Sequence, residues 1–316
     1  EIADGDWSSD VCSSDLFLDG VGLGSDEPER NPFAAVPTPT LDAVAGGDFV
    51  APRVGRRAAG RFERLDATLG VAGLPQSATG QTALLTGRNA ASAMDRHYGP
   101  WPGPTLKRLL DEGQLFTWAV RRFGLDAVAW GGAYPPGFFD ALERGRLRLN
   151  APAYAARGAG VTLPGEAAYR AGSAVAADLD GAWFASRGTE PPGGFVPGPA
   201  GAGRAGERLA AAAAGSAFTF LDVWLTDRIG HQGSMEDARD LVVRLDAFVA
   251  GVLRAREAAT TVVITSDHGN VEDLGHRRHT RAQVPLIVVG PGESAFEGAR
   301  SILDVATAVR AVWSTA

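Results

Sequence analysis

A short apolar strand that leads directly into metal-binding side chains is the feature that most limits how this chain can fold. Residues 261–264 are β-branched and apolar, which predicts a strand buried on both faces of a parallel sheet. Asp267 and His268 follow at once, at the edge where open α/β sheets bind their ligands. Asp, Gly and Asn are also common turn residues, so this segment alone does not establish a metal site.

Two further apolar runs end in the same kind of residue. The strand expected at 217–225 leads into Asp222, Asp227 and His231, and the run 16–18 leads into Asp19. The chain has five histidines, and three of them, at 231, 268 and 279, lie in such motifs beside carboxylates. Because imidazole with carboxylate suits Zn, Mn or Fe better than Ca or Mg, the pattern predicts a transition-metal site.

The glycines at 20, 22 and 24 offer an alternative, a dinucleotide-binding loop. The spacing is G-x-G-x-G, and the next residues form a loop with two prolines. A dinucleotide site needs a helix there, whose N-terminus receives the pyrophosphate, so the pattern argues against nicotinamide chemistry.

A candidate nucleophile lies in residues 73–88, where we expect a Pro-containing loop to run into a short helix. Hydroxyls at a helix N-terminus lie in a positive field that favours an alkoxide or a phosphate. The alternative is that they are helix caps, which is the commoner use. The residues themselves do not choose among Ser77, Thr79 and Thr82.

Helix and strand patterns alternate, which predicts a doubly wound α/β fold with a mostly parallel sheet. The clearest case is the helix expected from Ser234 to about Glu257, which precedes the strand at 261 and starts with a capping pair, Ser234 and Asp237. We expect residues 16–134 and 216–316 to form the metal-binding core. Residues 135–215, rich in Gly, Ala and Pro, are interpreted as a small cap or insertion, since their aromatic residues argue against a solvated linker.

The whole chain limits the partners. It has 316 residues and a net charge of -7 without long charged runs, which argues against nucleic acid and anionic membrane surfaces as partners. No run of eighteen apolar residues is present, and the single cysteine excludes an intrachain disulfide. A cytoplasmic setting is the default, and the oligomeric state is not indicated. Residues 1–15 are polar where a core strand should run, so we interpret them as a non-native or disordered start.

Taken together, these motifs resemble the alkaline phosphatase superfamily, in particular the metalloenzyme branch with cofactor-independent phosphoglycerate mutases and phosphopentomutases. Asp19-Gly20 is similar to the mutase D-G-W-G start, and residues 31–42 fit its N-A-I-x-x-A-x-T-P-x-x-D continuation. Residues 77–88 have the spacing of the mutase S-x-x-G and G-R residues, and Ser77 takes the nucleophile position of the sulfatase signature. The remaining matches are to D-x-V-G-H at 227–231, to D-H-G-N at 267–270, and to H-T-x-x-x-V-P at 279–285.

The resemblance implies an alkaline phosphatase-like core with two divalent metal ions, manganese or zinc. One ion would be held by Asp227, His231 and His279; the other would be held by Asp19, Ser77, Asp267 and His268. Ser77 would be the catalytic nucleophile, whereas His97 and His276 are expected outside the ligand set.

Two departures limit what the resemblance implies. Nothing fits the large second domain that the phosphoglycerate mutases insert after the nucleophile helix, because residues 105–110 and 127–130 resemble core helix and strand. Position 81 is Gln, where the sulfatases have Arg and the mutases His. The hypothesis is therefore a two-metal phosphoester hydrolase, a phosphatase or phosphodiesterase, that acts on a small phosphorylated substrate through a phosphoseryl intermediate. The alternative is a phosphomutase, because the short insertion favours hydrolysis without excluding a mutase. A remote alternative is a non-catalytic metal-binding protein.

Overall fold

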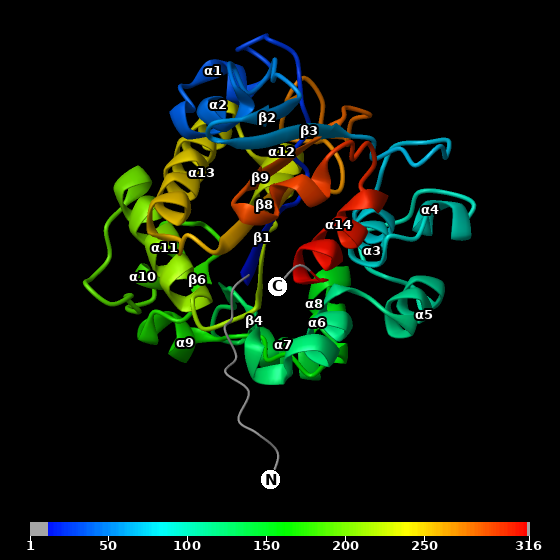
Figure 1. Ribbon diagram of the computed structural model, residues 1–316. Helices are drawn as coiled ribbons and strands as arrows, with labels where there is room; N and C mark the ends of the chain where they lie inside the picture. Colours follow the sequence, from blue (N-terminus) through cyan, green and yellow to red (C-terminus); the bar gives the residue numbers. More distant parts are fainter. Residues whose placement is uncertain (1–11, 315–316) are drawn as a thin grey trace.

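The computed structural model describes residues 12–314, and its centre is a seven-stranded sheet with helices on both faces (Figure 1). The strands lie in the order β2-β3-β9-β8-β1-β7-β4. Their bounds, in that order, are Gly55–Arg57, Gly60–Leu65, Val284–Val289, Thr260–Thr265, Cys12–Leu18, Phe218–Val223 and Val128–Trp130.

The middle of the sheet is parallel. Strand β1 pairs in parallel with β7 on one side and β8 on the other, and β4 extends the parallel part beyond β7. From β8 outward, β9, β3 and β2 pair antiparallel. The predicted α/β fold with a parallel centre is confirmed, and the antiparallel strands form one side of it.

Side chains alternate along the strands and so build a core on each face of the sheet. Leu16 and Leu18 of β1 pack toward one helical layer, and Phe17 packs toward the other. The first layer contains α1 (Pro32–Ala35), α2 (Pro39–Ala45), α11 (Gly198–Ala213) and α13 (Met235–Ala255). The second contains α3 (Ser77–Thr86), α4 (Ala90–Ala93), α5 (Pro104–Glu112), α6 (Leu115–Phe123), α8 (Ala151–Gly158) and α14 (Leu303–Ser314).

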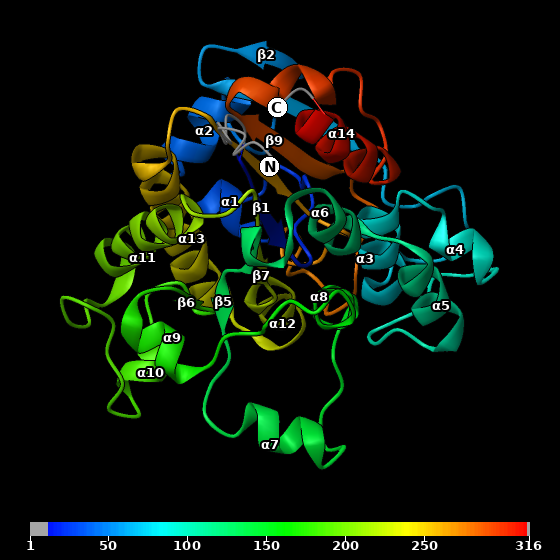
Figure 2. The same cartoon turned by 60° about the horizontal axis from the view of Figure 1, so that its bottom comes forward.

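Residues 135–215 do not form one separate insertion, which corrects the sequence interpretation. Helices α8 and α11 both belong to the main helical layers. A small two-stranded sheet, β5 (Gly132–Ala133) with β6 (Val175–Ala176), lies nearby with α9 (Glu166–Ala171) and α10 (Ala182–Ala185). Helix α7 (Phe138–Glu143) stands away from the body at the end of two extended connections (Figure 2).

The first strand begins at Cys12, earlier than the sequence indicated, because residues 12–15 pair with β7 and β8 despite their polar side chains. Residues 1–11 of the expected non-native start lie outside the described residues. The remaining elements are α12 (Leu225–Gln232) and two short 3-10 helices, Leu125–Ala127 and Pro291–Phe296. Within residues 12–314, no helix has the length and apolar character needed to cross a bilayer.

Helices α11 and α13 approach each other closely, which explains the Gly- and Ala-rich sequence of α11. A Cβ atom at Gly206 would overlap the carbonyl oxygen of Phe248, and one at Gly251 would overlap the carbonyl oxygen of Gly203. The small residues therefore allow backbone-to-backbone contact between the two helices. Ala is the best helix former, so the same composition that resembles low complexity supports a regular helix.

The substitution Gly206→Ala should destabilise the protein by about 1–3 kcal/mol, because the added methyl group meets backbone that cannot move without separating the two helices. Gly158→Ala is the matched control. Its Cβ would meet nothing within 4 Å on an exposed turn of α8, so it should be neutral or stabilising by up to about 1 kcal/mol. Urea unfolding measures both, and equal unfolding midpoints for the two variants would contradict the packing argument.

Candidate metal centre

The predicted ligands meet at the carboxyl ends of three neighbouring parallel strands. Asp19 follows β1, and Asp267 and His268 follow β8. Asp227 and His231 lie on α12, which begins directly after β7, and the loop before β9 carries His279. Because β8, β1 and β7 are adjacent and parallel, their ends bring residues separated by more than 200 positions to one edge.

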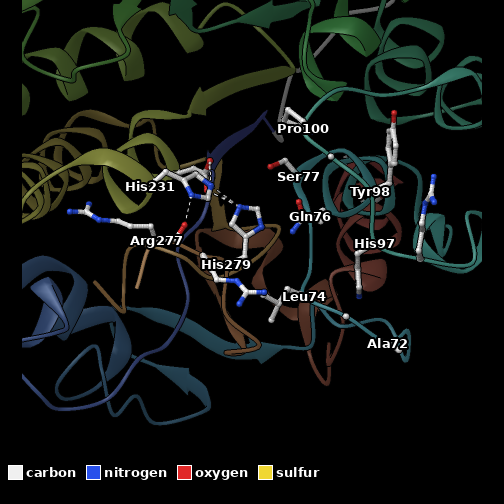
Figure 3. A pocket seen from close by; sticks show the side chains of 15 residues that line it. Ala72, Leu74, Gln76, Ser77, His97, Tyr98, Pro100, His231, Arg277 and His279 are labelled. Carbon is white, nitrogen blue, oxygen red and sulfur yellow. Dashed lines mark hydrogen bonds and ion pairs between the residues drawn. The ribbon is translucent and has the colours of Figure 1, made fainter. Parts of the chain in front are cut away.

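A first group of ligand atoms consists of Asp227, His231 and His279. The Nε2 atoms of the two imidazoles are 3.0 Å apart, and the Asp227 carboxylate oxygens lie 3.4 Å from His279 Nε2 and 3.5 Å from His231 Nε2. Figure 3 shows both imidazoles at the rim of a pocket, facing each other. A tetrahedral zinc ion with bonds of about 2.0–2.1 Å keeps its ligand atoms about 3.3 Å apart, so this spacing suits one ion.

A second group surrounds the Nε2 atom of the fully buried His268. Ser77 Oγ lies 3.0 Å from it, and the nearest oxygens of Asp19 and Asp267 each lie 3.4 Å from it. Asp227 also comes within 4.8 Å of both Asp19 and His268, so its carboxylate lies between the two groups. The predicted ligands therefore lie close together. Asp227, which the sequence assigned to one group, is adjacent to both.

All three imidazoles are oriented in the same way by backbone carbonyls. The Nδ1 atom of His231 lies 3.0 Å from the Arg277 carbonyl oxygen. The Nδ1 atom of His279 lies 2.7 Å from the Pro75 carbonyl oxygen, and that of His268 lies 3.3 Å from the Gly269 carbonyl oxygen. A carbonyl oxygen can only accept, so each Nδ1 carries a proton, and Nε2 offers a lone pair to a metal whenever the imidazole is neutral. Metal-ligating histidines are usually fixed in this manner.

Two buried carboxylate oxygens lack a partner. Asp19 Oδ1 and Asp267 Oδ2 accept no hydrogen bond from any described residue. Burial, with the neighbouring Asp227 carboxylate, raises the pKa of Asp267 to about 8; burial, then Asp267 and Asp227, also raises the pKa of Asp19. Burial, followed by the charge of His279, lowers the pKa of His268 to about 3, so this imidazole stays neutral. The donor set therefore fits a cation from outside the chain.

The pair of Asp227 and His279 is different, because each partner favours the charged form of the other. Burial alone would raise the pKa of Asp227, but the hydrogen bond from His279 and the nearby imidazoles hold it well below its usual range. Burial alone would lower the pKa of His279, but the hydrogen bond and charge of Asp227 raise it. This ion pair is what the first group forms without a metal.

Several residues that sequence reasoning did not assign hold the ligands in place. Gln81 donates to Asp19 Oδ2 at 3.1 Å, and Asn270 donates to Asp227 Oδ1 at 2.6 Å. The buried Glu272 carboxylate accepts from the backbone N–H of Gly22 at 2.9 Å and of Asn270 at 2.7 Å, and from the Thr280 hydroxyl. Asn270 and Thr280 lie in the D-H-G-N and H-T motifs, which signalled a site but not these partners.

The structure also distinguishes the three candidate hydroxyls. Ser77 is the first residue of α3 and lines the pocket. The Thr79 hydroxyl donates to Gln76 O at 3.0 Å, and Thr82 Oγ1 is buried without a hydrogen-bond partner among the described residues. Gly80 permits this placement of α3, because a Cβ there would lie only 2.8 Å from the Asp267 carbonyl oxygen.

The pocket itself has a volume of about 790 Å³, and three of its lining residues, Arg96, Arg277 and Arg278, are basic. In a chain of net charge -7, this local excess of guanidinium groups suits an anionic ligand. His97 lines the pocket with its Nε2 3.3 Å from Val71 O, and His276 lies 3.6 Å from Asp273. Neither histidine belongs to the two ligand groups.

The comparisons with known proteins agree with the two ligand groups. The sequence model of the Metalloenzyme superfamily matches residues 204–311, the part that carries five of the seven predicted ligands. A stretch of 97 residues is 41% identical to the 2,3-bisphosphoglycerate-independent phosphoglycerate mutase of Rhodopirellula baltica. The enzyme of that name from Methylobacillus flagellatus is 34% identical over 95 residues. These matches confirm the resemblance to the metalloenzyme branch of the alkaline phosphatase superfamily.

The extent of these matches is limited. Each of the two mutase matches covers 27% of this chain and 18% of the length of the mutase. Among solved structures, the PH0037 protein of Pyrococcus horikoshii aligns over 97% of both chains with a TM-score of 0.55 and 14% sequence identity. At that identity, the likeness supports the fold alone.

The substitution Asp267→Asn should stabilise the metal-free protein at pH 8. The pKa of the Asp267 carboxyl is about 8 in the folded protein and about 4 in the unfolded chain. The folded state therefore favours the protonated carboxyl, and the free energy of unfolding falls as the pH rises from about 4 to about 8. The amide of Asn cannot ionise. The melting temperature of the Asp267→Asn variant in EDTA should therefore exceed that of the wild type by at least about 2 °C.

Added zinc or manganese should raise the wild-type melting temperature strongly and that of Asp267→Asn weakly. Asp140→Asn on the exposed face of α7 is the control for a lost negative charge. Equal responses of the wild type and Asp267→Asn to metal would show that Asp267 is not a ligand. Differential scanning calorimetry with and without EDTA measures both effects.

Proposed function

We propose that the protein is a metal-dependent phosphoester hydrolase in which Ser77 attacks phosphorus and water releases the phosphate. The observation that carries this proposal is the position of Ser77 Oγ, 3.0 Å from His268 Nε2 and at the N-terminus of α3. A nucleophilic hydroxyl beside buried carboxylates and the neutral imidazole of His268 is an arrangement suited to phosphoryl transfer.

The proposed metal ligands are the two groups described above. Asp227, His231 and His279 would hold one ion, and the other would be held by Asp19, Ser77, Asp267 and His268. Divalent ions there would lower the pKa of the Ser77 hydroxyl and neutralise negative charge on the phosphoryl group that is transferred. The mixture of imidazole and carboxylate favours zinc or manganese.

The residues of this chain then have separate tasks. Ser77 Oγ forms a bond to phosphorus as the bond from phosphorus to the leaving oxygen breaks, which gives a phosphoseryl enzyme. The N-terminus of α3 stabilises the added negative charge. Arg278 lines the pocket, where its guanidinium group can orient the phosphate oxygens. Water finally attacks the phosphoserine and returns the Ser77 hydroxyl.

Hydrolysis is supported by how little chain is available to cover the pocket. A mutase must keep water from its phosphorylated intermediate while the substrate reorients, which requires a substantial lid. Since α8 and α11 belong to the main layers, residues 135–215 leave only α7, α9, α10 and their connections for that purpose.

A phosphomutase is the second candidate, and the names of the relatives favour it over hydrolysis. The aligned relatives are phosphoglycerate mutases, with 41% and 34% identity in the matched segments. Those segments make up 18% of each mutase, so the parts that direct the phosphoryl group in those enzymes are not compared. The product of the reaction decides between the two candidates.

Ser77→Ala should lower turnover by at least about 1000-fold with little change in stability, because it removes the nucleophile and only one oxygen atom. Thr82→Val is the matched control, since the Thr82 hydroxyl has no hydrogen-bond partner among the described residues and its loss should leave turnover nearly unchanged. Mass spectrometry of enzyme quenched during turnover should find phosphate on Ser77. Phosphate on Thr79, or full activity of Ser77→Ala, would refute the assignment, and inactive wild type with full metal binding would favour a non-catalytic protein.

Metal-loaded protein should release inorganic phosphate from a simple aryl phosphate or a phosphodiester, because the open pocket admits water to the phosphoserine. Phosphate release measured with a colorimetric assay tests this directly. The same preparation should be incubated with 3-phosphoglycerate and with pentose phosphates. Interconversion of their isomers without phosphate release would establish the mutase and reject the hydrolase.

A further inference from the structure

A second cavity, of about 570 Å³, lies beside the metal pocket and is built mainly from aromatic and arginine side chains. It lies between α12, α10 and the segment that carries α7. We name it the Asp222 cavity, after the carboxylate in its wall. Its other polar and aromatic lining residues include Asn150, Tyr134, Trp183, Trp224, Arg148 and Arg228.

Asp222 is an unusual residue at this place. It lies within β7 and is only 4% exposed, on the face where Phe218 and Phe220 pack into the core. Asn150 donates to its Oδ2 at 2.6 Å, whereas Oδ1 has no hydrogen-bond partner among the described residues. A buried carboxylate oxygen without a donor is costly, so the cavity offers an acceptor that a ligand with an N–H or O–H group would satisfy.

The arginines give the cavity a net positive charge. Arg148, Arg187 and Arg228 all line it, and none forms an ion pair with an acidic side chain within residues 12–314. The guanidinium of Arg228 lies 5.8 Å from the ring centre of Trp183, and that of Arg148 lies 5.7 Å from the ring centre of Trp101. Three cations against one carboxylate suit a ligand that also carries negative charge.

The aromatic walls suit a flat ligand. Trp183 and Trp224 are neighbours, with ring centres 5.4 Å apart, and both remain partly exposed. Tyr134 and Phe138 stack at 3.9 Å on the side formed by the α7 segment. Exposed aromatic faces with nearby guanidinium groups are a stacking surface for a planar ring.

The cavity is connected to the metal pocket in two ways. Asp227 lines the pocket and its neighbour Arg228 lines the cavity, so α12 forms a wall of both. A smaller hollow of about 490 Å³ shares Tyr98 and Gly99 with the pocket and shares Trp101 and Arg148 with the cavity. The cavity and the pocket therefore adjoin each other through this hollow.

We propose that the Asp222 cavity binds the leaving group of the substrate, and that this group is a planar heteroaromatic ring with an N–H donor, as in a nucleotide. The inference rests on the proposed phosphoryl transfer at Ser77. The ring stacks on the tryptophans, its N–H group donates to Asp222 Oδ1, and the phosphate lies toward the arginines and the metal pocket.

Binding is tested first without catalysis, in EDTA, by quenching of tryptophan fluorescence. The ligands are the four common ribonucleoside 5′-monophosphates, with glycerol 3-phosphate as the control without a ring. At least one nucleotide should bind about tenfold or more tightly than glycerol 3-phosphate. If no nucleotide binds more tightly than the control, the proposal is wrong.

The variants assign that binding to this cavity. Asp222→Asn should weaken the best nucleotide about tenfold and leave glycerol 3-phosphate unchanged or tighter, because a negative charge has been removed. Asp140→Asn, exposed on α7, is the matched control and should change neither. If Asp222→Asn does not fold, Trp183→Leu, at a partly exposed position, should cause a similar loss through stacking. Nucleotide binding that neither variant weakens would place the ring elsewhere.

Catalysis separates this inference from the proposed function. In metal-loaded protein, Asp222→Asn should lower kcat/KM for the best nucleotide about tenfold and leave kcat/KM for glycerol 3-phosphate unchanged. If the wild type releases phosphate from an aryl phosphate but handles nucleotides no better than glycerol 3-phosphate, the inference is wrong and the function stands. If nucleotides bind in an Asp222-dependent manner but no substrate loses phosphate, the proposed function is wrong, and with it the leaving-group role.

Discussion

Three carboxylates, those of the buried Asp19 and Asp267 and the half-buried Asp227, lie beside one another at the end of the sheet, and their mutual repulsion is the constraint on which the site depends. The repulsion raises the pKa of Asp19 and Asp267 beyond the effect of burial itself. The hydrogen bond from His279 relieves Asp227 only. His268, at the centre of the cluster, is neutral, so it adds no compensating charge. A chain that keeps this arrangement pays in stability unless cations bind there, and the fixed Nε2 lone pairs supply the remaining ligands for them.

The glycine run after Asp19 has its explanation in the same place. Gly20 has a φ of 73°, which favours glycine, and a Cβ at Gly22 would overlap the Glu272 carboxylate. The run therefore lets the loop after β1 pass against the loop after β8, where Val21 N donates to Ser266 Oγ at 2.9 Å. The glycines serve close backbone packing between two ligand-bearing loops. This agrees with the spacing argument against a dinucleotide site, because no pyrophosphate is needed to account for them.

What could be predicted from the sequence was local. Apolar strands that end in Asp and His reveal the candidate ligands, because a strand and the residue after it are adjacent in the chain, and the capped helix before β8 is equally local. The roles of Gln81 and Glu272 could not be predicted, since each depends on partners 62 and 250 positions away, Asp19 and Gly22. The membership of α11 in the main layer was missed for a different reason. Its Ala and Gly content resembles a linker until the backbone of α13 is known to lie against it.

Helix α12 joins the metal centre to the Asp222 cavity through helical periodicity. Asp227 and His231 are four residues apart and therefore share one face, which lies toward the metal pocket. Trp224 and Arg228 are also four apart and share the adjacent face, which lies toward the cavity. Since Asn270 donates to both the backbone oxygen and the side chain of Asp227, the loop after β8 fixes the rotation of the helix. A rotation that moved the predicted ligands would move Trp224 and Arg228 with them, so the same contacts set the geometry of the proposed ring-binding surface and of the predicted metal ligands.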